Sequence, residues 1–347
     1  MSDEIYRVGI IGCGGVARAH ANAYRRHPKT QMVAAADINP EAVDNFAREF
    51  DIPARYTDYR EMLDSEQIDI LSVCTWPMSH AEITVAAAET GGVKGILCEK
   101  PMATNLGEAD AMLEACDHNG VKLVVGHQRR FEPVNVTARR LILEGAIGQP
   151  TLAFRKASGG LLNWGTHLID TIRYLLGDPE TLWVLGQISR KTDRYERRMR
   201  IEDFSAAIIC FEGGTRGVIE VDLPGPGMPA ALMYGSDGMI AYQDGRIFLT
   251  NKKGATEVQP RGDGMNQLEE LIAWIEGRVE EHRGSGRQAR YTMEIMMAIY
   301  ESVRIRDVVR MPLQIKESPL EMMISEGILK VERPGRYDIR VPFENQK

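Results

Sequence analysis

The sequence predicts an α/β protein in which a parallel sheet, covered by helices on both faces, precedes an α+β domain with a large, mostly antiparallel open sheet. Two observations carry this prediction. Apolar runs alternate with helical patterns up to about residue 126, which is typical of a parallel sheet. Beyond Gly126, strand-like runs come in pairs joined by glycine turns, which is typical of antiparallel hairpins. We therefore expect two domains, 1–126 and 127–347.

The first domain is predicted from the period of its apolar residues. Its expected strands are Tyr6–Ile11, Met32–Ala36, Asp69–Cys74, Gly95–Cys98 and Lys122–Val125, and its expected helices are Val16–Arg26, Pro40–Phe50, His80–Glu89 and Leu106–Asn119. Capping residues support two of the helix ends. Asn39 precedes Pro40 where a helix begins, and Asn119-Gly120 ends the helix before the last strand.

The second domain is predicted from its hairpins. Expected strands are Phe204–Phe211, Thr215–Asp222, Leu232–Tyr234, Met239–Tyr242 and Arg246–Thr250, with helices at Val134–Leu143, Thr166–Leu176, Gln267–Glu280 and Arg290–Arg304 against one face and an arm over 313–347. A sheet face that its own chain leaves uncovered must be wet or pair with another subunit. We therefore expect a homodimer or homotetramer formed through this sheet.

Composition narrows the classes of partner. The net charge of −7 provides no basic field for nucleic acid, and no apolar stretch approaches the 18 residues that a membrane span needs. The acidic N-terminus lacks the pattern of a secretion signal. The five cysteines form no CxxC pair and no metal-ligand spacing, so we expect reduced thiols, no bound metal and a cytoplasmic location.

A glycine-rich turn follows the first predicted strand and opens the first predicted helix. Gly12 permits the tight turn, Gly14 lets backbone amides approach a pyrophosphate, and the small Ala17 allows close packing of helix on strand. Asp37 closes the next strand, where its carboxylate can accept hydrogen bonds from ribose hydroxyls and would repel a 2′-phosphate. The pattern predicts a dinucleotide site of the Rossmann type that favours NAD over NADP, with Cys13, Gly15 and Val16 completing the phosphate loop.

Two positions are candidates for proton transfer beside a nicotinamide. Lys100 follows the strand Gly95–Cys98, at the sheet edge where such folds bind ligands, and Pro101 restricts its backbone. An ordinary surface lysine is the alternative. Asn163 and His167 lie four residues apart where a helix is expected to begin, with Asp170 able to orient the imidazole. A capping asparagine and a buried structural histidine are the alternative there.

Five ordered motifs resemble the signatures of the glucose-fructose oxidoreductase, inositol dehydrogenase and rhizopine-catabolism (Gfo/Idh/MocA) family. They are Gly12-x-Gly14-x-x-Ala17, Cys74-Thr75-x-Pro77-x-x-His80, Glu99-Lys100-Pro101, Gly126-x-x-Arg129-Arg130-Phe131-x-Pro133 and Gly165-Thr166-His167-x-x-Asp170. The resemblance covers about 90% of the chain. It implies a Rossmann domain, a C-terminal domain on an open sheet, and dehydrogenation of a sugar or cyclitol.

The resemblance also implies roles for single residues. In the family, a lysine, an aspartate and a histidine four residues later form the catalytic group; Lys100 and His167 match, but Asn163 stands in place of the aspartate. A neutral amide cannot take up a proton, so Asn163 is expected only to orient substrate. The implied cofactor contacts beyond the phosphate loop are Cys74, Thr75, Trp76, His80, Glu99, Lys100 and Gln128. The expected substrate contacts are Asn163, Trp164, Asp170 and Arg129.

Together these observations predict an NAD-dependent oxidoreductase acting on a secondary hydroxyl of a sugar, sugar acid or cyclitol, or on the corresponding ketone. Lys100 would exchange the hydroxyl proton, and His167 would relay or anchor it. Two alternatives stay open at this point. One is a redox-neutral sugar enzyme that retains its NAD. The other is a catalytically idle ligand-sensing protein, which stays possible because Asn163 replaces the family's aspartate.

Overall fold

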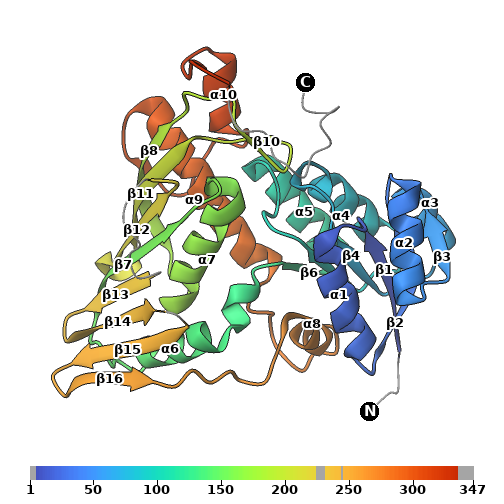
Figure 1. Ribbon diagram of the computed structural model, residues 1–347, viewed down its shortest axis with the longest axis horizontal. Coiled ribbons are helices and arrows are strands. Elements are labelled where there is room, and N and C mark those ends of the chain that lie inside the picture. The colour runs from blue at the N-terminus through green and yellow to red at the C-terminus, as the bar shows by residue number, and fades with distance from the viewer. Residues whose placement is uncertain (1–4, 224–230, 244, 335–347) are drawn as a thin grey trace. The chain divides into compact units, whose positions relative to one another are not determined.

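The computed structural model describes residues 5–223, 231–243 and 245–334, and the chain divides into two compact units. The first unit contains residues 1–103, 108–126 and 266–287, and the second contains residues 104–107, 127–265 and 288–347. Figure 1 shows the elements of both units. The predicted arm over 313–347 begins with α10 (Pro319–Ser325), and its last part, 335–347, lies outside the described residues.

The first unit is built on a six-stranded parallel sheet in the order β3-β2-β1-β4-β5-β6. Its strands are β1 (Tyr6–Ile11), β2 (Thr30–Ala36), β3 (Ala54–Tyr56), β4 (Ile70–Val73), β5 (Gly95–Cys98) and β6 (Lys122–Val125). Its helices are α1 (Gly15–Arg26), α2 (Pro40–Phe50), α3 (Tyr59–Ser65), α4 (His80–Glu89), α5 (Leu106–His118) and α8 (Gln267–Ile275). The predicted parallel sheet is confirmed; the short β3 and α3 lacked a long enough apolar pattern to be predicted.

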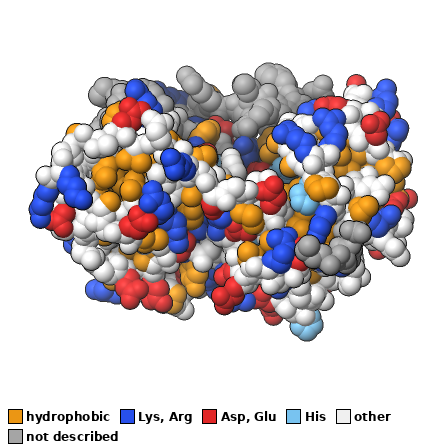
Figure 2. Space-filling model, turned by 90° about the horizontal axis from the view of Figure 1, so that it is seen from below, with side chains coloured by type: hydrophobic (Ala, Val, Ile, Leu, Met, Phe, Trp, Pro, Cys, Tyr) orange, Lys and Arg blue, Asp and Glu red, His pale blue; other side chains and the backbone are white. Residues whose placement is uncertain are grey.

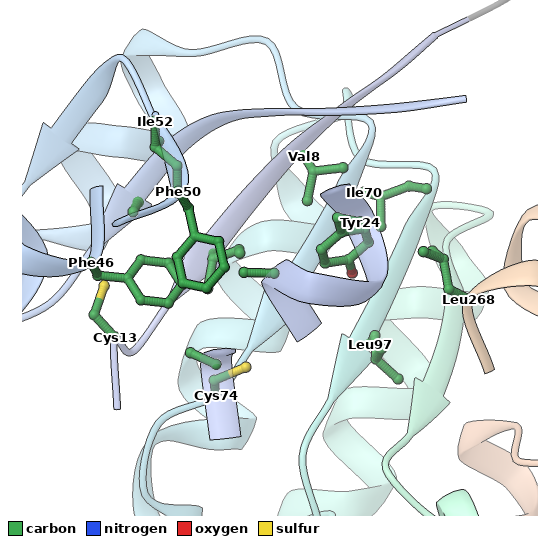
Figure 3. Packing of buried hydrophobic residues seen from close by; sticks show 14 of the residues in the cluster. Val8, Cys13, Tyr24, Phe46, Phe50, Ile52, Ile70, Cys74, Leu97 and Leu268 are labelled. Carbon is green, nitrogen blue, oxygen red and sulfur yellow. The ribbon is translucent and has the colours of Figure 1, made fainter. Parts of the chain in front are cut away.

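The core of this unit explains why its strands read as unbroken apolar runs. Strands β1 and β4 carry buried side chains on both faces, as a sheet sandwiched between helices requires. Phe46 and Phe50 of α2 pack together with 4.9 Å between ring centroids, and Figure 3 shows them with Val8 and Cys13. Leu268 of α8 belongs to the same cluster.

One helix packs on a different sheet from the one expected. The pattern at 267–280 was expected to lie against the second sheet, but α8 belongs to the first unit, where Leu271 is buried. A Cβ at Gly95 of β5 would meet the side chains of Ile275 and Leu271. The amphipathic period predicts that a helix covers a sheet; it carries no information on which sheet.

The second unit is built on a nine-stranded mixed sheet in the order β16-β15-β14-β13-β7-β12-β11-β8-β17. Its strands are β7 (Pro150–Ala157), β8 (Thr181–Ser189), β11 (Phe204–Phe211), β12 (Arg216–Val221), β13 (Ala231–Gly235), β14 (Gly238–Gln243), β15 (Arg246–Asn251), β16 (Gly254–Val258) and β17 (Val309–Arg310), and β9 (Tyr195–Glu196) pairs separately with β10 (Met199–Arg200). Its helical elements are η2 (Gln128–Phe131), α6 (Pro133–Leu143), η3 (Leu161–Gly165), α7 (Thr166–Leu175), η4 (Glu212–Gly214) and α10, with α9 (Gly286–Ile305) entering at its first residues from the other unit. The predicted antiparallel hairpins are confirmed; among the described strands of this sheet, β7 and β12 form the one parallel pair.

Helices cover one face of this sheet. A Cβ at Gly217 of β12 would meet Ile172 of α7, and a Cβ at Gly186 of β8 would meet the backbone of Ile299 in α9. Glycine is required at Gly186, because the carbonyl oxygen of Ile299 lies 2.4 Å from that Cβ position. The backbones of β8 and α9 are therefore in close contact at Gly186.

Charges of both signs are interspersed on the face that Figure 2 shows. Figure 2 shows basic and acidic side chains mixed on the visible face rather than gathered into a basic patch. Among the described residues, no helix combines the length and the apolar character that crossing a membrane would require.

Candidate functional site

The glycine-rich loop between β1 and α1 has the geometry of a phosphate cradle. Gly12 has φ of +88°, and a Cβ there would lie 2.7 Å from the backbone of Cys74, so only glycine fits. Gly14 caps α1 without a side-chain hydrogen bond, and nothing lies within 4 Å of a Cβ position at Gly14 or Gly15. The first amides of α1 therefore face open space, where a helix N-terminus attracts anions.

Asp37, at the end of β2, holds this loop in place. One carboxylate oxygen accepts from the backbone N–H of Cys13 at 2.7 Å, and the other accepts from the N–H of Asn39 at 2.9 Å. Each oxygen keeps a further lone pair, so hydrogen bonds from a ribose remain available to it. Burial, together with the charge of Asp37, raises the pKa of the Cys13 thiol to about 12, which leaves that cysteine unreactive.

His80 joins two loops at the carboxyl edge of the sheet. Its ring is fully buried; Nε2 lies 3.1 Å from the carbonyl oxygen of Thr75, and Nδ1 lies 2.9 Å from that of Pro101. Burial lowers its pKa. Backbone carbonyls of the loops after β4 and β5 thus face both ring nitrogens. The expected contact of His80 with a cofactor stays a prediction.

Glu99 lies at the centre of a buried polar chain behind the predicted lysine. Its Oε1 accepts from His20 Nε2 at 3.1 Å, while its Oε2 accepts from the backbone N–H of Lys100 at 3.2 Å. Although burial raises the pKa of Glu99, the hydrogen bond and charge of His20 and the charge of Lys100 outweigh it and lower that pKa. A Cβ at Gly126 would lie 2.9 Å from Oε1, so the carboxylate also packs against the chain after β6.

Lys100, two residues after β5, is 6% exposed. The ordinary surface lysine that the sequence left open is therefore excluded by its burial. Cys74, Thr75, Trp76, Glu99 and Lys100 all follow β4 or β5, so the first unit brings the predicted cofactor residues together at one edge of its sheet.

In the second unit, Asn163 lies in a π-helical turn rather than in the first turn of an α-helix. Both Trp164 N–H and Gly165 N–H donate to the carbonyl oxygen of Gly160, at 2.9 and 3.1 Å, and α7 starts only at Thr166. The expected i, i+4 helical relation of Asn163 to His167 is therefore altered by this wider turn. Such turns are frequent at functional sites.

Two carboxylates that are distant in sequence anchor this turn: Glu202 lies just before β11, and Asp222 directly follows β12. Glu202 accepts from Leu161 N–H and from the Tyr300 hydroxyl, both at 2.7 Å. Asp222 accepts from Gly159 N–H at 2.9 Å and Gly160 N–H at 2.8 Å. Sequence reasoning assigned no role to Glu202 or Asp222, because one precedes a predicted strand and the other ends one, and neither position gave a signal.

Asp170 binds an arginine instead of orienting His167. Both its oxygens accept from Arg130 Nε at 3.0 Å, and Oδ1 lies 3.3 Å from His127 Nδ1. Burial alone would raise the pKa of Asp170, but the charges of Arg130 and His127 outweigh burial, so the pKa is lowered. The expected Asp170–His167 hydrogen bond is thus replaced by a buried ion pair, because α7 turns Asp170 toward Arg130. An aspartate three residues after a histidine does not by itself specify the partner.

Aromatic side chains surround His167. Its ring centroid lies 5.9 Å from that of Trp164 and 6.0 Å from that of His127, both edge-on. The Arg129 guanidinium lies over the Trp164 ring at 5.2 Å, and burial lowers the pKa of Arg129. The second unit therefore gathers Trp164, His167 and Arg129, with Asn163 buried nearby in sequence and Gln128 exposed on η2.

The described residues contain no cluster of three or more side chains suited to a metal ion. The candidate groups are backbone amides and a lysine in the first unit, and histidines, an arginine and a side-chain amide in the second. Groups of these kinds can bind a dinucleotide or a polyol and can transfer protons.

Comparison with known proteins gives the same assignment. Residues 6–127 match the oxidoreductase family with the NAD-binding Rossmann fold, and residues 152–241 match the GFO/IDH/MocA C-terminal domain. The chain belongs to the Gfo/Idh/MocA family of oxidoreductases, as the motifs predicted.

Two relatives illustrate the level of similarity. The chain is 26% identical over 364 residues to D-apiose dehydrogenase of Paraburkholderia graminis, covering 94% of this chain and 95% of that protein. It is 26% identical over 268 residues to myo-inositol 2-dehydrogenase of Thermotoga maritima, covering 73% and 77%. Both relatives are dehydrogenases by name.

Solved structures confirm the fold. Levoglucosan dehydrogenase in complex with NADH superposes with a TM-score of 0.78 at 24% identity, covering 90% of this chain and all of that one (100%). An oxidoreductase from Agrobacterium radiobacter in complex with NAD+, L-tartaric acid and magnesium gives a TM-score of 0.75 at 21% identity, covering 88% and 98%.

Proposed function

We propose that this protein is an NAD-dependent dehydrogenase that oxidises a secondary hydroxyl of a sugar, sugar acid or cyclitol, or reduces the corresponding ketone. The observation that carries the proposal is the buried Lys100 beside Glu99, at the same sheet edge as the glycine-rich loop. The dehydrogenase names of the relatives do not favour the redox-neutral or idle alternatives.

The residues present fit a dinucleotide. Exposed Gly14, Gly15 and Val16 present the free N-terminal amides of α1 to a pyrophosphate. Asp37 would accept from the ribose and disfavour a 2′-phosphate, which supports the preference for NAD over NADP. Bound NAD supplies the hydride acceptor.

The chain's own side chains supply proton transfer and orientation. Neutral Lys100 accepts the hydroxyl proton as the carbon is oxidised and returns it in the reverse direction. His167, bordered by Trp164 and His127, hydrogen-bonds the substrate and relays the proton onward. Asn163 orients a hydroxyl through its amide, and Arg129 stacked on Trp164 forms a further polar contact.

Following NADH absorbance against a panel of sugars, sugar acids and inositols tests this function. We expect NADH with at least one member and none with Lys100→Ala. Mass spectrometry of silent reactions separates a redox-neutral conversion from no reaction. A protein that binds NAD yet converts no panel member by either readout would contradict the proposal.

We further propose that the protein is a homodimer or homotetramer formed through the second sheet. The face opposite α7 and α9 carries an apolar row in register across its strands, in which Leu185 and Ile208 are 42% and 37% exposed. The row comprises Leu185, Ile208, Val218, Phe154, Leu232, Ala241 and Phe248. Such a row lowers the free energy when a second copy covers it.

Light scattering with Ile208→Glu tests the assembly. We expect wild type to show two or four subunits and the variant to dissociate, because a carboxylate placed in a buried apolar row is costly. Glu220→Gln, on the partly exposed β12, is the matched control that keeps the assembly. A monomeric wild type would overturn this proposal.

A cytoplasmic location is part of the proposal. It is supported by the five cysteines, which are all buried and free. Cell fractionation with an antibody to the chain would test it.

A further inference from the structure

The polar chain behind Lys100 includes a histidine that the proposed reaction does not use. His20 comes from α1, the helix that the glycine-rich loop opens, and it is 8% exposed. Its Nδ1 lies 2.9 Å from Ser72 Oγ, and Ser72 Oγ lies 2.7 Å from the Tyr24 hydroxyl. Its Nε2 lies 3.1 Å from Glu99 Oε1. Both nitrogens therefore have fixed partners inside the fold.

We propose that His20 is a positioning residue for proton transfer: its imidazolium neutralises the Glu99 carboxylate, so that Glu99 can hold the Lys100 backbone without holding the lysine amine in its protonated form. The inference rests on the proposed function, in which the neutral amine of Lys100 accepts a proton.

The geometry gives each group one task. Glu99 Oε2 accepts from the Lys100 N–H, which fixes the start of the lysine loop, and Oε1 is turned away toward His20. A buried carboxylate needs a counter-charge, since isolated burial of an anion is costly. Of the two cations near Glu99, His20 and Lys100, only His20 can stay charged while Lys100 acts as a base.

The titratable groups near His20 come from three elements. Glu99 faces it from the end of β5, Cys74 from the end of β4, and Tyr24 lies on the same helix. Burial opposes the charge on His20, but Cys74 and Glu99 together raise its pKa to about 10. The coupling is reciprocal, because the charges of both His20 and Lys100 lower the pKa of Glu99.

Loss of the His20 charge should raise the pKa of the Lys100 amine. In His20→Gln, Glu99 remains as an uncompensated anion beside Lys100, so the pKa of the lysine amine rises and fewer molecules carry the neutral base. In oxidation, kcat/KM rises with pH as the lysine amine loses its proton, and the midpoint of this rise should move upward by about one pH unit. Glu99→Gln should move it downward, and the double variant should return it to within about 0.3 unit of wild type.

A spectroscopic measurement tests the ion pair without substrate or NAD. The Cε1–H resonance of His20, assigned through its contacts to Tyr24, should keep the imidazolium shift from pH 6 to 9. Titration of His20 near pH 6.5 would overturn the proposal. The wild-type chain suffices for this experiment, so a variant that fails to fold does not weaken it.

The pH profile of the His20→Gln variant then distinguishes a positioning role of His20 from a purely structural one. A His20→Gln variant that loses kcat at every pH with an unmoved limb would show a structural role and overturn the proposal. His118→Gln, on the exposed part of α5, is the matched control, and Cys74→Ser tests whether the thiol rather than Glu99 is the partner. A wild type that forms no NADH overturns the proposed function, while the histidine titration still decides the ion pair.

Discussion

The two units hold their candidate residues by different physical means. In the first unit, Gly12, Asp37 and Lys100 each follow a buried parallel strand, so the sheet itself brings them to one edge. In the second unit, Asn163 lies in a π-helical turn, and Glu202 and Asp222, which flank other strands, hold the backbone amides of Gly159, Gly160 and Leu161. The candidate cofactor residues are thus placed by local pattern, and the candidate substrate residues by contacts between distant residues.

Substitutions should therefore have different consequences in the two units. A change at a strand end of the first unit alters chemistry or nucleotide choice while the sheet persists. A change at an anchoring carboxylate of the second unit leaves a buried amide without a partner, and therefore alters fold and catalysis together.

The largest expected effect is at Lys100. Lys100→Ala should lower kcat by about 10³-fold, because it removes the base, while calorimetry finds the Kd of NAD within about twofold of wild type. Lys252→Ala, at an 83% exposed lysine, is the control and should change neither quantity. Retained turnover in Lys100→Ala would remove the lysine from the mechanism.

The next largest effect is expected at Glu202 and should be confined to the second unit. Glu202→Leu leaves the Leu161 N–H and the Tyr300 hydroxyl unpaired, which should lower the free energy of unfolding by about 2–3 kcal/mol and kcat/KM by about 10- to 100-fold. Tyr300→Phe removes one of the two hydrogen bonds and should show a smaller loss. Denaturant melts, kinetics and NAD calorimetry together check it; a weakened NAD affinity would erase the contrast between the units.

A smaller effect is expected at Asp37. Asp37→Ala should weaken NAD binding about tenfold, because it removes both the predicted ribose contact and the hydrogen bond to Cys13 N–H, while NADP binding changes little. Calorimetry with both nucleotides measures the ratio, with the exposed Asp64→Ala as control. An unchanged ratio would mean that another residue reads the ribose.

The smallest expected effect concerns stability against pH. The folded pKa of His20, about 10, lies above its ordinary value of 6.5, so its contribution is full below pH 6.5 and is lost as pH rises toward 10. The difference in unfolding free energy between wild type and His20→Gln should therefore shrink by about 1 kcal/mol or more between pH 6.5 and 10. Urea melts across this range would show a constant difference if His20 were neutral.

Most of the first unit could be predicted because its signals are local. The apolar runs at β1 and β5, the cap at Asn39 and the glycine turn each depend on neighbours in sequence. The covering helix α8 could not be placed, since its amphipathic face fits either sheet.

The second unit was predicted in class but less so in detail. The hairpin of β11 and β12 was predicted from its glycine turn. By contrast, β7 pairs with β12 and β8 pairs with β11 across intervening elements, and such pairings leave no local mark in the sequence. The partner of Asp170 was mistaken for the same reason: Arg130 reaches it through the fold, across 40 residues.

The sequence by itself determined the fold class, the family and the residue types available for cofactor and proton chemistry, because turn geometry and hydrophobic period act over a few residues. Only the tertiary structure decided that His80 binds backbone carbonyls, that Asp170 pairs with Arg130 and that His20 faces Glu99. These contacts depend on which buried charge meets which partner, and that choice is made when distant segments pack together.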